Sequence, residues 1–567
     1  MTPPPARRAH RRRVLAKVAA ASAVVVIPLA VLLADGAISS RPIGAVPIVA
    51  GTTAAAPTAC ARRVNDSPAK LVDCVRTTDL WQHLVNFQLI ADANPGPDGH
   101  PSRNSGEPGY KASADYVATA MRAAGYDVTM QQYTFHYFSF LGTPVFREEA
   151  PTPHAWTVGK DVTAARVAGT TTAKFQPAAG MVVPATPTPS SASGCRPSDF
   201  AAFTPGNIAL IQRGTCTFGT KVANAEAAGA TGVVFFNEGN PGRTGLVSSS
   251  LPEGVRIPVV FTPYAVGAQL LAQYKATGDT GPTLTIEVRA VEDPNRADWN
   301  VIADSKGGDP NNILVIDAHL DAIYGAGMLD NASGSAAILD IAQQLQNTTT
   351  RNKLRFIWFG GEELGLLGSI HYIDTLPPSE LAKIRFDLDA DVLGTPNYVA
   401  GILDPKVGVT LFGRTPGTPR PPSIFAPSAI GRDYGIDYLT SIGKKSILFS
   451  ADGTDAFTFQ QVGIPASGVL TGQDCCKLQS DVTLFGGHQG NFEGTVPGTD
   501  GGCVDNPFRW CDNLSDNDPQ VLTWMSKTFA SMVAHLAYDT QVFTPTDSGG
   551  HVKAAPPQAA TTVKVAS

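Results

Sequence analysis

The sequence predicts an α/β protein with a mainly parallel central sheet flanked by helices, into which a small, strand-rich domain is inserted. From residue 300 onward, short buried-strand patterns alternate with helical ones, as is typical of parallel sheets. Between residues 151 and 296 the composition changes to Pro, Thr, Gly and short β-branched runs. The length of 567 residues exceeds what one core usually encloses, so we expect at least two domains.

The N-terminal segment, residues 1–37, is predicted to be a signal peptide or signal anchor. Several arginines and Lys17 precede an uncharged apolar run from Val18 to Ala34. A run of about 17 residues is at the lower limit for spanning a bilayer, so cleavage and retention both stay open. We therefore expect an exported protein, secreted or at the cell surface, whose membrane contact is confined to this segment if it is retained.

The eight cysteines are expected to form disulfides, because the environment beyond the membrane is oxidising. A zinc–thiolate site is less favoured, since no CxxC pair occurs. The local pairs that the spacing suggests are Cys60 with Cys74, Cys195 with Cys216, and Cys503 with Cys511. Cys475 and Cys476 are left without a predicted partner.

The first folded domain is expected to be discontinuous, formed by residues 71–150 and 297–542. Residues 38–70 are predicted to be a flexible spacer and residues 543–567 a disordered tail, because both are rich in small and polar residues. Apolar residues at three- and four-residue spacing predict helices at 80–85 and 109–117, the second ending at Gly125. A strand is expected from Tyr126.

The inserted domain, residues 151–296, is predicted from the strand patterns 208–211, 232–236 and 257–260, with a helix at 221–228. The run IALIQRGTCTF from Ile208, with the helix and strand that follow, resembles the protease-associated domain. That resemblance implies a lid-like module and assigns no chemistry to it.

The charge of the chain argues against nucleic acid as a partner. The formal net charge is -6 and no long basic run occurs, whereas a basic face is the usual footprint of phosphate binding.

The first candidate site residues follow the buried-strand pattern 313–316. His319 is expected at the carboxyl end of this strand, where ligands gather in such sheets. Asp321 is placed to accept the second ring N–H of His319 and so fix its tautomer as a metal ligand. Asp330 either caps the helix that follows or, on the same rim, bridges two cations.

Two further strands supply more carboxylates. After strand 354–359, Gly360 and Gly361 allow a sharp turn, so that Glu362 and Glu363 point in different directions, one to a metal and one free as a general base. In strand 386–397, alternation places Asp387, Asp389 and Asp391 on one face. Such acids repel one another unless a cation or solvent neutralises them. A metal site and a solvated edge strand both remain open at this stage.

Together, the runs AHLD, LDNASGSAA, FGGEELGLLGS and DADVLGTPN resemble the secreted di-zinc aminopeptidase family, which shares its zinc exopeptidase fold with glutamate carboxypeptidase and transferrin receptor. The resemblance implies that His319 and Asp391 bind one Zn²⁺, that Glu363 binds a second, and that Asp330 bridges them. It further implies that Glu362 is the general base in the hydrolysis of N-terminal residues from peptide substrates.

The C-terminal third departs from the family pattern. Relatives carry a Tyr-His pair between a cysteine and an Asp, and this His completes the second zinc site, but no His occurs between Cys503 and Asp512. Aligned on Cys503, Asp505 takes the His position and is a competent zinc ligand. Aligned on Cys511, that position is a phenylalanine, and His488 is a further substitute. We favour Asp505.

A second departure is at 452–455, where relatives have Gly-Arg-Ser-Asp and this chain lacks the Arg.

Three functional hypotheses follow from these observations. An active aminopeptidase is favoured because the general base and four metal ligands persist. The alternatives are a catalytically impaired binding protein on the same scaffold, and a related zinc carboxypeptidase or glutaminyl cyclase, the last requiring only one zinc.

Overall fold

The structure is a computed structural model, and it describes residues 60, 63–185, 191–249, 251–252, 254–278, 281–323, 325–407, 417–473, 477–490, 492 and 512–541. The predicted signal segment 1–37, most of the spacer and the tail 543–567 lie outside these residues. Asp505 also lies outside them, as do the predicted pair Cys503 and Cys511 and the two cysteines without a predicted partner, Cys475 and Cys476.

The first of the two sheets has eight strands, four of them parallel at its centre. Its order is β1 (Asp127–Phe140), β10 (Ala290–Asp304), β12 (Asn352–Phe359), β11 (Asp309–His319), β13 (Ile384–Asp391), β16 (Ala466–Leu470), β14 (Gly401–Leu403) and β15 (Ile447–Phe449). Strands β12, β11, β13 and β16 run parallel. The flanking strands β10 and β14 are antiparallel to them. This confirms the predicted, mainly parallel α/β fold.

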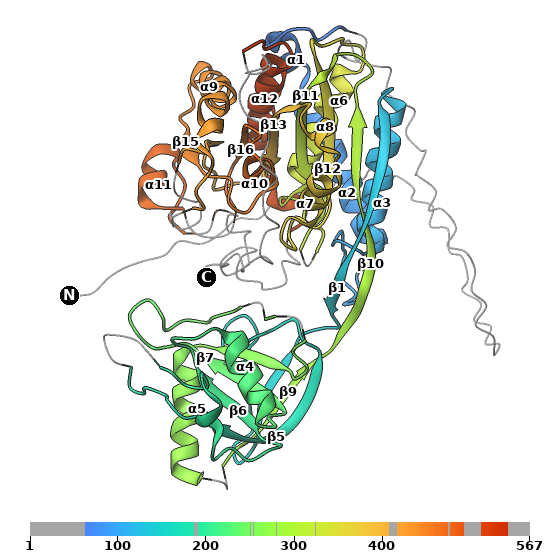
Figure 1. Ribbon diagram of the computed structural model, residues 1–567. Coiled ribbons are helices and arrows are strands. Elements are labelled where there is room, and N and C mark those ends of the chain that lie inside the picture. Colours follow the sequence, from blue (N-terminus) through green and yellow to red (C-terminus); the bar gives the residue numbers. More distant parts are fainter. Residues whose placement is uncertain are drawn as a thin grey trace, which may run out of the picture. The chain divides into compact units, whose positions relative to one another are not determined.

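Helices cover both faces of this sheet (Figure 1). One face packs against α1 (Pro68–Cys74), α2 (Thr77–Ala93), α3 (Pro108–Ala123), α6 (Ala332–Leu345), α9 (Phe425–Ser441) and α12 (Pro519–Leu536). The other packs against α7 (Leu367–Thr375) and α10 (Ala456–Gln461). The short helices α8 (Pro378–Leu381) and α11 (Gln479–Phe485) complete the described helices of this part.

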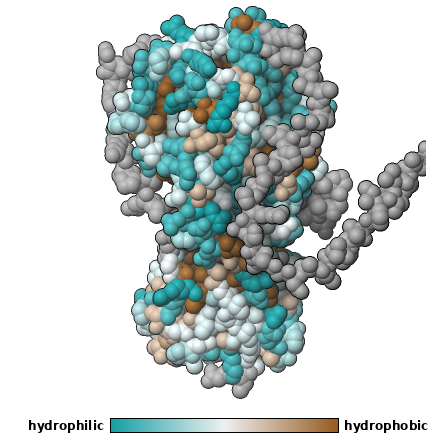
Figure 2. All heavy atoms as spheres, turned by 90° about the vertical axis from the view of Figure 1, so that its right-hand side faces the viewer, coloured by the Kyte–Doolittle hydropathy of each residue, from teal (hydrophilic) through white to brown (hydrophobic). Residues whose placement is uncertain are grey.

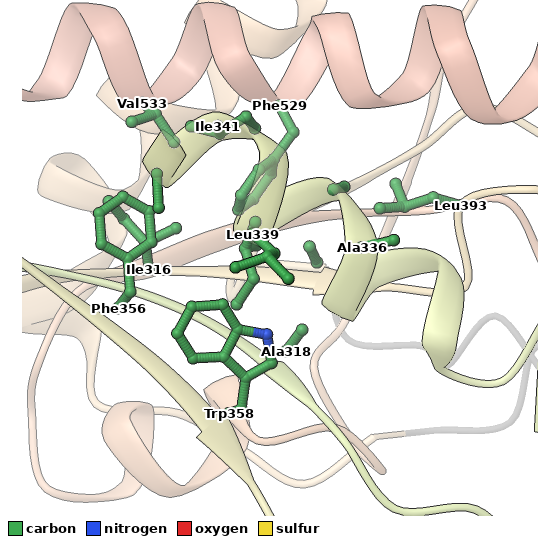
Figure 3. Packing of buried hydrophobic residues seen from close by; sticks show 14 of the residues in the cluster. Ile316, Ala318, Ala336, Leu339, Ile341, Phe356, Trp358, Leu393, Phe529 and Val533 are labelled. Atoms are coloured by element: carbon green, nitrogen blue, oxygen red, sulfur yellow. The ribbon is translucent and has the colours of Figure 1, made fainter. Parts of the chain in front are cut away.

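Strand β11 shows how the sequence assigns residues to the two faces. Leu314, Ile316 and Ala318 belong to the core beneath α6, together with Trp358 of β12 (Figure 3). Ile313 and Val315 belong to the core on the opposite face. Successive side chains of a strand alternate between faces. The positions that follow, Asp317 and His319, therefore project away from α6, on the side where α10 lies.

The second sheet also has eight strands, in the order β3, β2, β9, β5, β6, β7, β8, β4. Their bounds are β2 (Val145–Ala150), β3 (His154–Ala155), β4 (Thr163–Ala164), β5 (Gly169–Pro177), β6 (Ile208–Gln212), β7 (Gly232–Phe236), β8 (Val259–Thr262) and β9 (Thr283–Val288). Because β2 pairs with β9, this sheet begins before the expected domain boundary at residue 151.

The inserted domain holds two α-helices among its described residues, where the sequence predicted one. The expected helix is α4 (Phe218–Ala227), and the additional one is α5 (Tyr264–Thr277). In α5, Val266, Leu270 and Leu271 are buried against the sheet. The prediction of a single helix was wrong: α5 begins at Tyr264, and Pro263, its N-cap, is the one residue between it and β8.

The predicted spacer also ends earlier than residue 70. Asn65 is buried, and its side-chain amide donates to the Gln344 carbonyl at the end of α6, 2.7 Å away. The disulfide between Cys60 and Cys74 ties this segment to α1. Residues 63–70 are thus part of the folded domain.

Both predicted disulfides that fall on described residues are confirmed, Cys60–Cys74 and Cys195–Cys216. Hydrophilic and neutral residues cover most of the face shown in Figure 2. Among the described residues, every helix is too short or too polar to cross a bilayer.

Candidate metal centre

The centre of the site is His319, at the carboxyl end of β11. Its Nε2 atom lies 3.1 Å from Asp330 Oδ1, 3.2 Å from Asp391 Oδ1 and 3.9 Å from Glu362 Oε2. All four side chains are buried. The ligand atoms of His319, Asp330 and Asp391 lie within 4.8 Å of one another. Three of the predicted metal ligands and the predicted base are therefore brought together.

The start of α6 separates the role of Asp330 from that of its neighbour. Asn331 is the N-cap, and its Oδ1 accepts the Gly334 N–H at 2.8 Å and the Val392 N–H at 3.1 Å. The peptide bond between Asp330 and Asn331 is cis. Since Asn331 caps the helix, the carboxylate of Asp330 faces His319, as the bridging role requires.

The close approach of α6 to β13 depends on a glycine. A Cβ atom at Gly334 would lie 2.1 Å from the carbonyl oxygen of Ala390. No side chain larger than hydrogen fits there, so the first turn of α6 can lie directly against the strand that carries Asp391.

The turn after β12 presents Glu362 and Glu363, and Asp321 holds it in place. Gly361 has φ 66°, in the left-handed region that favours glycine. The Asp321 carboxylate accepts the backbone N–H of Glu362 at 3.2 Å and that of Glu363 at 3.4 Å. Asp321 thus connects the turn to the strand that bears His319.

The predicted contact between Asp321 and the His319 ring takes a modified form. The atom nearest to Nδ1 is the backbone oxygen of Asp321, at 3.1 Å, and the carboxylate Oδ1 is 3.5 Å away. Both groups favour a proton on Nδ1, which leaves Nε2 free to bind a metal.

Strand β13 lies in the centre of the sheet, so the alternative of a solvated edge strand was wrong. Asp387, Asp389 and Asp391 are all buried. Asp391 faces His319, whereas Asp389 accepts hydrogen bonds from the Thr454 hydroxyl and the Ala456 N–H. Of the three acids on this face, only Asp391 reaches the metal centre.

The electrostatics of the centre are those of a site built around a cation. Burial disfavours a charged imidazole, but the facing carboxylates, Glu362 first, outweigh burial and hold the pKa of His319 well above its usual value. Burial, with the neighbouring charge of Glu363 adding to it and His319 opposing it, raises the pKa of Glu362 well above that of an exposed glutamate. Burial likewise raises the pKa of Asp391. These buried carboxyl groups therefore bind a proton, or another cation, more tightly than exposed ones do.

The residues present fit zinc. One imidazole nitrogen and several carboxylate oxygens, buried and converging on one point, form a donor set that Zn²⁺ accepts readily. The second-layer contacts that orient such ligands are also present, in Asp321 and Asn331.

The structure describes one of the two residues, Asp505 and His488, that the sequence offers as the last ligand of the second zinc site. Asp505 lies outside the described residues and stays a prediction. His488 is exposed, and its backbone N–H donates to Asn397 Oδ1. The buried ligand group found in the described part of the chain does not include it.

Sequence reasoning missed two buried acids near the centre. Asp512 accepts the backbone N–H groups of Leu329 and Asp330, at 2.7 and 3.1 Å. Asp455 starts α10, and burial, with Asp389 nearby, raises its pKa well above the usual value. Both stand in the two stretches that depart from the family pattern: Asp512 is the acid that follows the missing Tyr-His pair, and Asp455 ends the altered Gly-Arg-Ser-Asp motif.

Comparison with protein families gives two matches along the chain. Residues 300–488 match the model of peptidase family M28, and residues 178–270 match that of the PA domain. The first match contains the His319, Asp330, Glu362 and Asp391 motifs, and the second lies within the strand-rich insertion.

Relatives and solved structures agree with these matches. The chain is 34% identical over 484 residues to an aminopeptidase of Pseudomonas aeruginosa, covering 84% of each chain. It is 32% identical over 417 residues to leucine aminopeptidase 2 of Trichophyton tonsurans, covering 73% of this chain and 77% of that one. Similar structures include an aminopeptidase from Aneurinibacillus sp. strain AM-1, with TM-score 0.57, 20% identity and coverage of 85% and 99%. A zinc aminopeptidase from Bacillus subtilis has TM-score 0.54, 21% identity and coverage of 84% and 97%. The structural likenesses show a shared fold.

Proposed function

This chain belongs to peptidase family M28, and we propose that it is an exported zinc aminopeptidase that uses two Zn²⁺ ions and Glu362 as general base. The family, with aminopeptidases as relatives over most of the chain, supports a zinc-dependent aminopeptidase acting on peptides. The observation that carries the finer proposal is the buried convergence of His319, Asp330 and Asp391, with Glu362 at its edge.

The ligands are assigned as the sequence motifs imply. His319 and Asp391 would hold one zinc, Glu363 would hold the other, and Asp330 would be shared by both. Asp505 is proposed to complete the second site. When bound, the metals supply Lewis-acid activation of water and of the scissile carbonyl group.

Glu362 moves the proton. Its side chain reaches the edge of the ligand group, and Asp321 fixes its backbone through the N–H of the turn. A buried carboxylate binds a proton more tightly than an exposed one does. Glu362 can therefore take a proton from the attacking water, hold it, and give it to the departing amine, a contribution typically worth about 10²–10⁴-fold in rate.

Export is proposed from the N-terminal pattern of basic residues followed by an apolar run. Two disulfides in the described residues support it, since disulfides persist in oxidising environments. N-terminal sequencing of protein recovered from the culture medium tests this. Protein retained in the cytoplasm with reduced cysteines would refute it.

The test of the enzymatic proposal combines metal analysis with hydrolysis. Purified protein should hold two zinc ions per chain and cleave leucine p-nitroanilide, but not its N-acetylated form. Glu362→Ala should keep both zinc ions and lose activity by about 10²–10⁴-fold. Glu380→Ala, at a partly exposed glutamate of α8 that pairs with Lys383, serves as the matched control and should keep wild-type zinc content and activity.

The same measurements separate the other hypotheses. Two zinc ions without hydrolysis of any free or blocked peptide would support a binding protein. One zinc with release of cyclised N-terminal glutamine would support a glutaminyl cyclase. Full activity in Glu362→Ala would refute the role of Glu362.

A further inference from the structure

The segment 103–105, in the loop before α3, forms hydrogen bonds with the backbone of the two loops beside the candidate metal ligands. The Arg103 side chain is completely buried. Its guanidinium group donates to the Leu320 carbonyl at 2.7 Å, the Ala326 carbonyl at 2.6 Å and the Gly327 carbonyl at 2.7 Å. All three acceptors lie in the irregular loop that joins His319 to Asp330.

The two residues after Arg103 extend these contacts. Asn104 Oδ1 accepts the N–H of Gly325, in the same loop, at 3.0 Å. Ser105 Oγ accepts the N–H of Gly361 at 2.7 Å, in the turn that presents Glu362 and Glu363. Arg103, Asn104 and Ser105 thus bind both the loop that joins His319 to Asp330 and the turn that presents Glu362 and Glu363.

Asp512 holds the other end of the His319–Asp330 loop. Its two carboxylate oxygens accept the N–H groups of Leu329 and Asp330. Asp512 is buried and opposite in charge to Arg103. A cationic donor therefore binds carbonyl groups of the loop, while an anionic acceptor binds its N–H groups next to Asp330.

The geometry is specific to these side chains. Arginine offers donors in a fixed planar fork, and here each of its three nitrogen atoms donates to a carbonyl group of one loop. The guanidinium carbon of Arg103 also lies over the Phe87 ring, 5.0 Å from its centroid. Lysine could not make the same three contacts, because its donors share one nitrogen atom.

We propose that Arg103, Ser105 and Asp512 are positioning residues that set the distances between the metal ligands, so that the zinc affinity of the folded protein depends on them. The proposal rests on the proposed zinc site. Residues that orient metal ligands typically change metal affinity by about 10–100-fold when they are replaced. A merely structural role would lower the stability of the apo protein and leave its zinc affinity when folded unchanged.

The experiment measures zinc dissociation constants of full-length apo protein by competition with a chelating dye, below the unfolding temperature of each variant. The variants are Arg103→Met, Arg103→Lys, Ser105→Ala and Asp512→Asn. The matched control is Arg355→Met, because Arg355 is also largely buried and multiply bonded, to Asp304 and Tyr372, away from the site.

We expect Arg103→Met and Asp512→Asn to weaken zinc binding by about 10–100-fold, Arg103→Lys to restore it only in part, and Ser105→Ala to weaken it less. Arg355→Met should lose stability and keep the wild-type zinc affinity. If Arg103→Met does not fold, Asp512→Asn and Ser105→Ala decide. Wild-type zinc affinity in the folded variants would overturn the inference, whereas a wild-type protein that binds no zinc would overturn the proposed site instead.

Discussion

Replacing Asp321 with asparagine tests whether one buried carboxylate controls both metal loops. Its oxygens accept the N–H groups of Glu362 and Glu363 and lie 3.5 Å from His319 Nδ1. Asparagine has nearly the same shape, but it keeps only one acceptor oxygen. Its amide N–H₂ would face one of the two backbone N–H donors, so the turn that presents Glu362 must shift.

The size of the effect follows from these contacts. A hydrogen bond to a charged group contributes about 1.5–3 kcal/mol, and Asp321→Asn loses one such bond together with the charge that orients His319. A loss of about 2 kcal/mol in transition-state stabilisation corresponds to about a thirtyfold fall in kcat/KM. We expect a fall of this size because the turn that presents Glu362 and Glu363 would shift.

The assay is leucine p-nitroanilide hydrolysis at saturating zinc, with the zinc content and the unfolding temperature of each variant measured in parallel. The control is Asp309→Asn, the same substitution at an exposed position of β11, the strand that precedes Asp321. Unchanged kcat/KM in a folded, zinc-loaded Asp321→Asn protein would refute the reasoning.

Three further predictions concern stability. Burial raises the pKa of Asp340 from 3.8 to about 7, so its contribution to stability is present below pH 3.8 and is lost as the pH rises through 7. Asp340→Asn should therefore have a higher free energy of unfolding than wild type above pH 7 but not below pH 3.8. Urea unfolding at both pH values tests this, and an equal difference between the two proteins at each pH would contradict it. Replacing Cys195 and Cys216 by serine should cost about 3 kcal/mol in the same assay, since the bond closes a loop with a sequence separation of 21. Gly334→Ala should lower the unfolding temperature strongly, because its Cβ would meet a backbone oxygen of β13, whereas Gly245→Ala has open space and should be neutral.

Much of the fold could be predicted because it depends on local periodicity. In β11, the continuous apolar run 313–316 predicted a buried strand with His319 at its carboxyl end, and residues of this run do belong to the cores on both faces of the sheet. The sequence was less informative about where one element ends and the next begins, and about the order of strands in the sheet. Helix α5, which Pro263 alone separates from β8, was missed, and β13 could not be placed as a central strand from its own residues.

The predicted site was found largely because its ligands stand in short motifs at strand ends. His319, Asp330, Glu362 and Asp391 lie together because β11, β12 and β13 are parallel neighbours, so their carboxyl ends meet at one edge. Asp321 was correctly paired with His319, although the closer contact to the ring comes from its backbone oxygen.

By itself, the sequence determined which side chains can bind metal and which face of each strand they occupy, since both follow from residue type and from the two-residue period of a strand. The tertiary structure alone decided what holds them in place. Asp512 reaches Leu329 across a sequence separation of 183, and Arg103 reaches Leu320 across 217. These are contacts to backbone N–H and carbonyl groups, which every residue carries, so no residue pattern marks the partner. Only the packing of distant segments against one loop selects it.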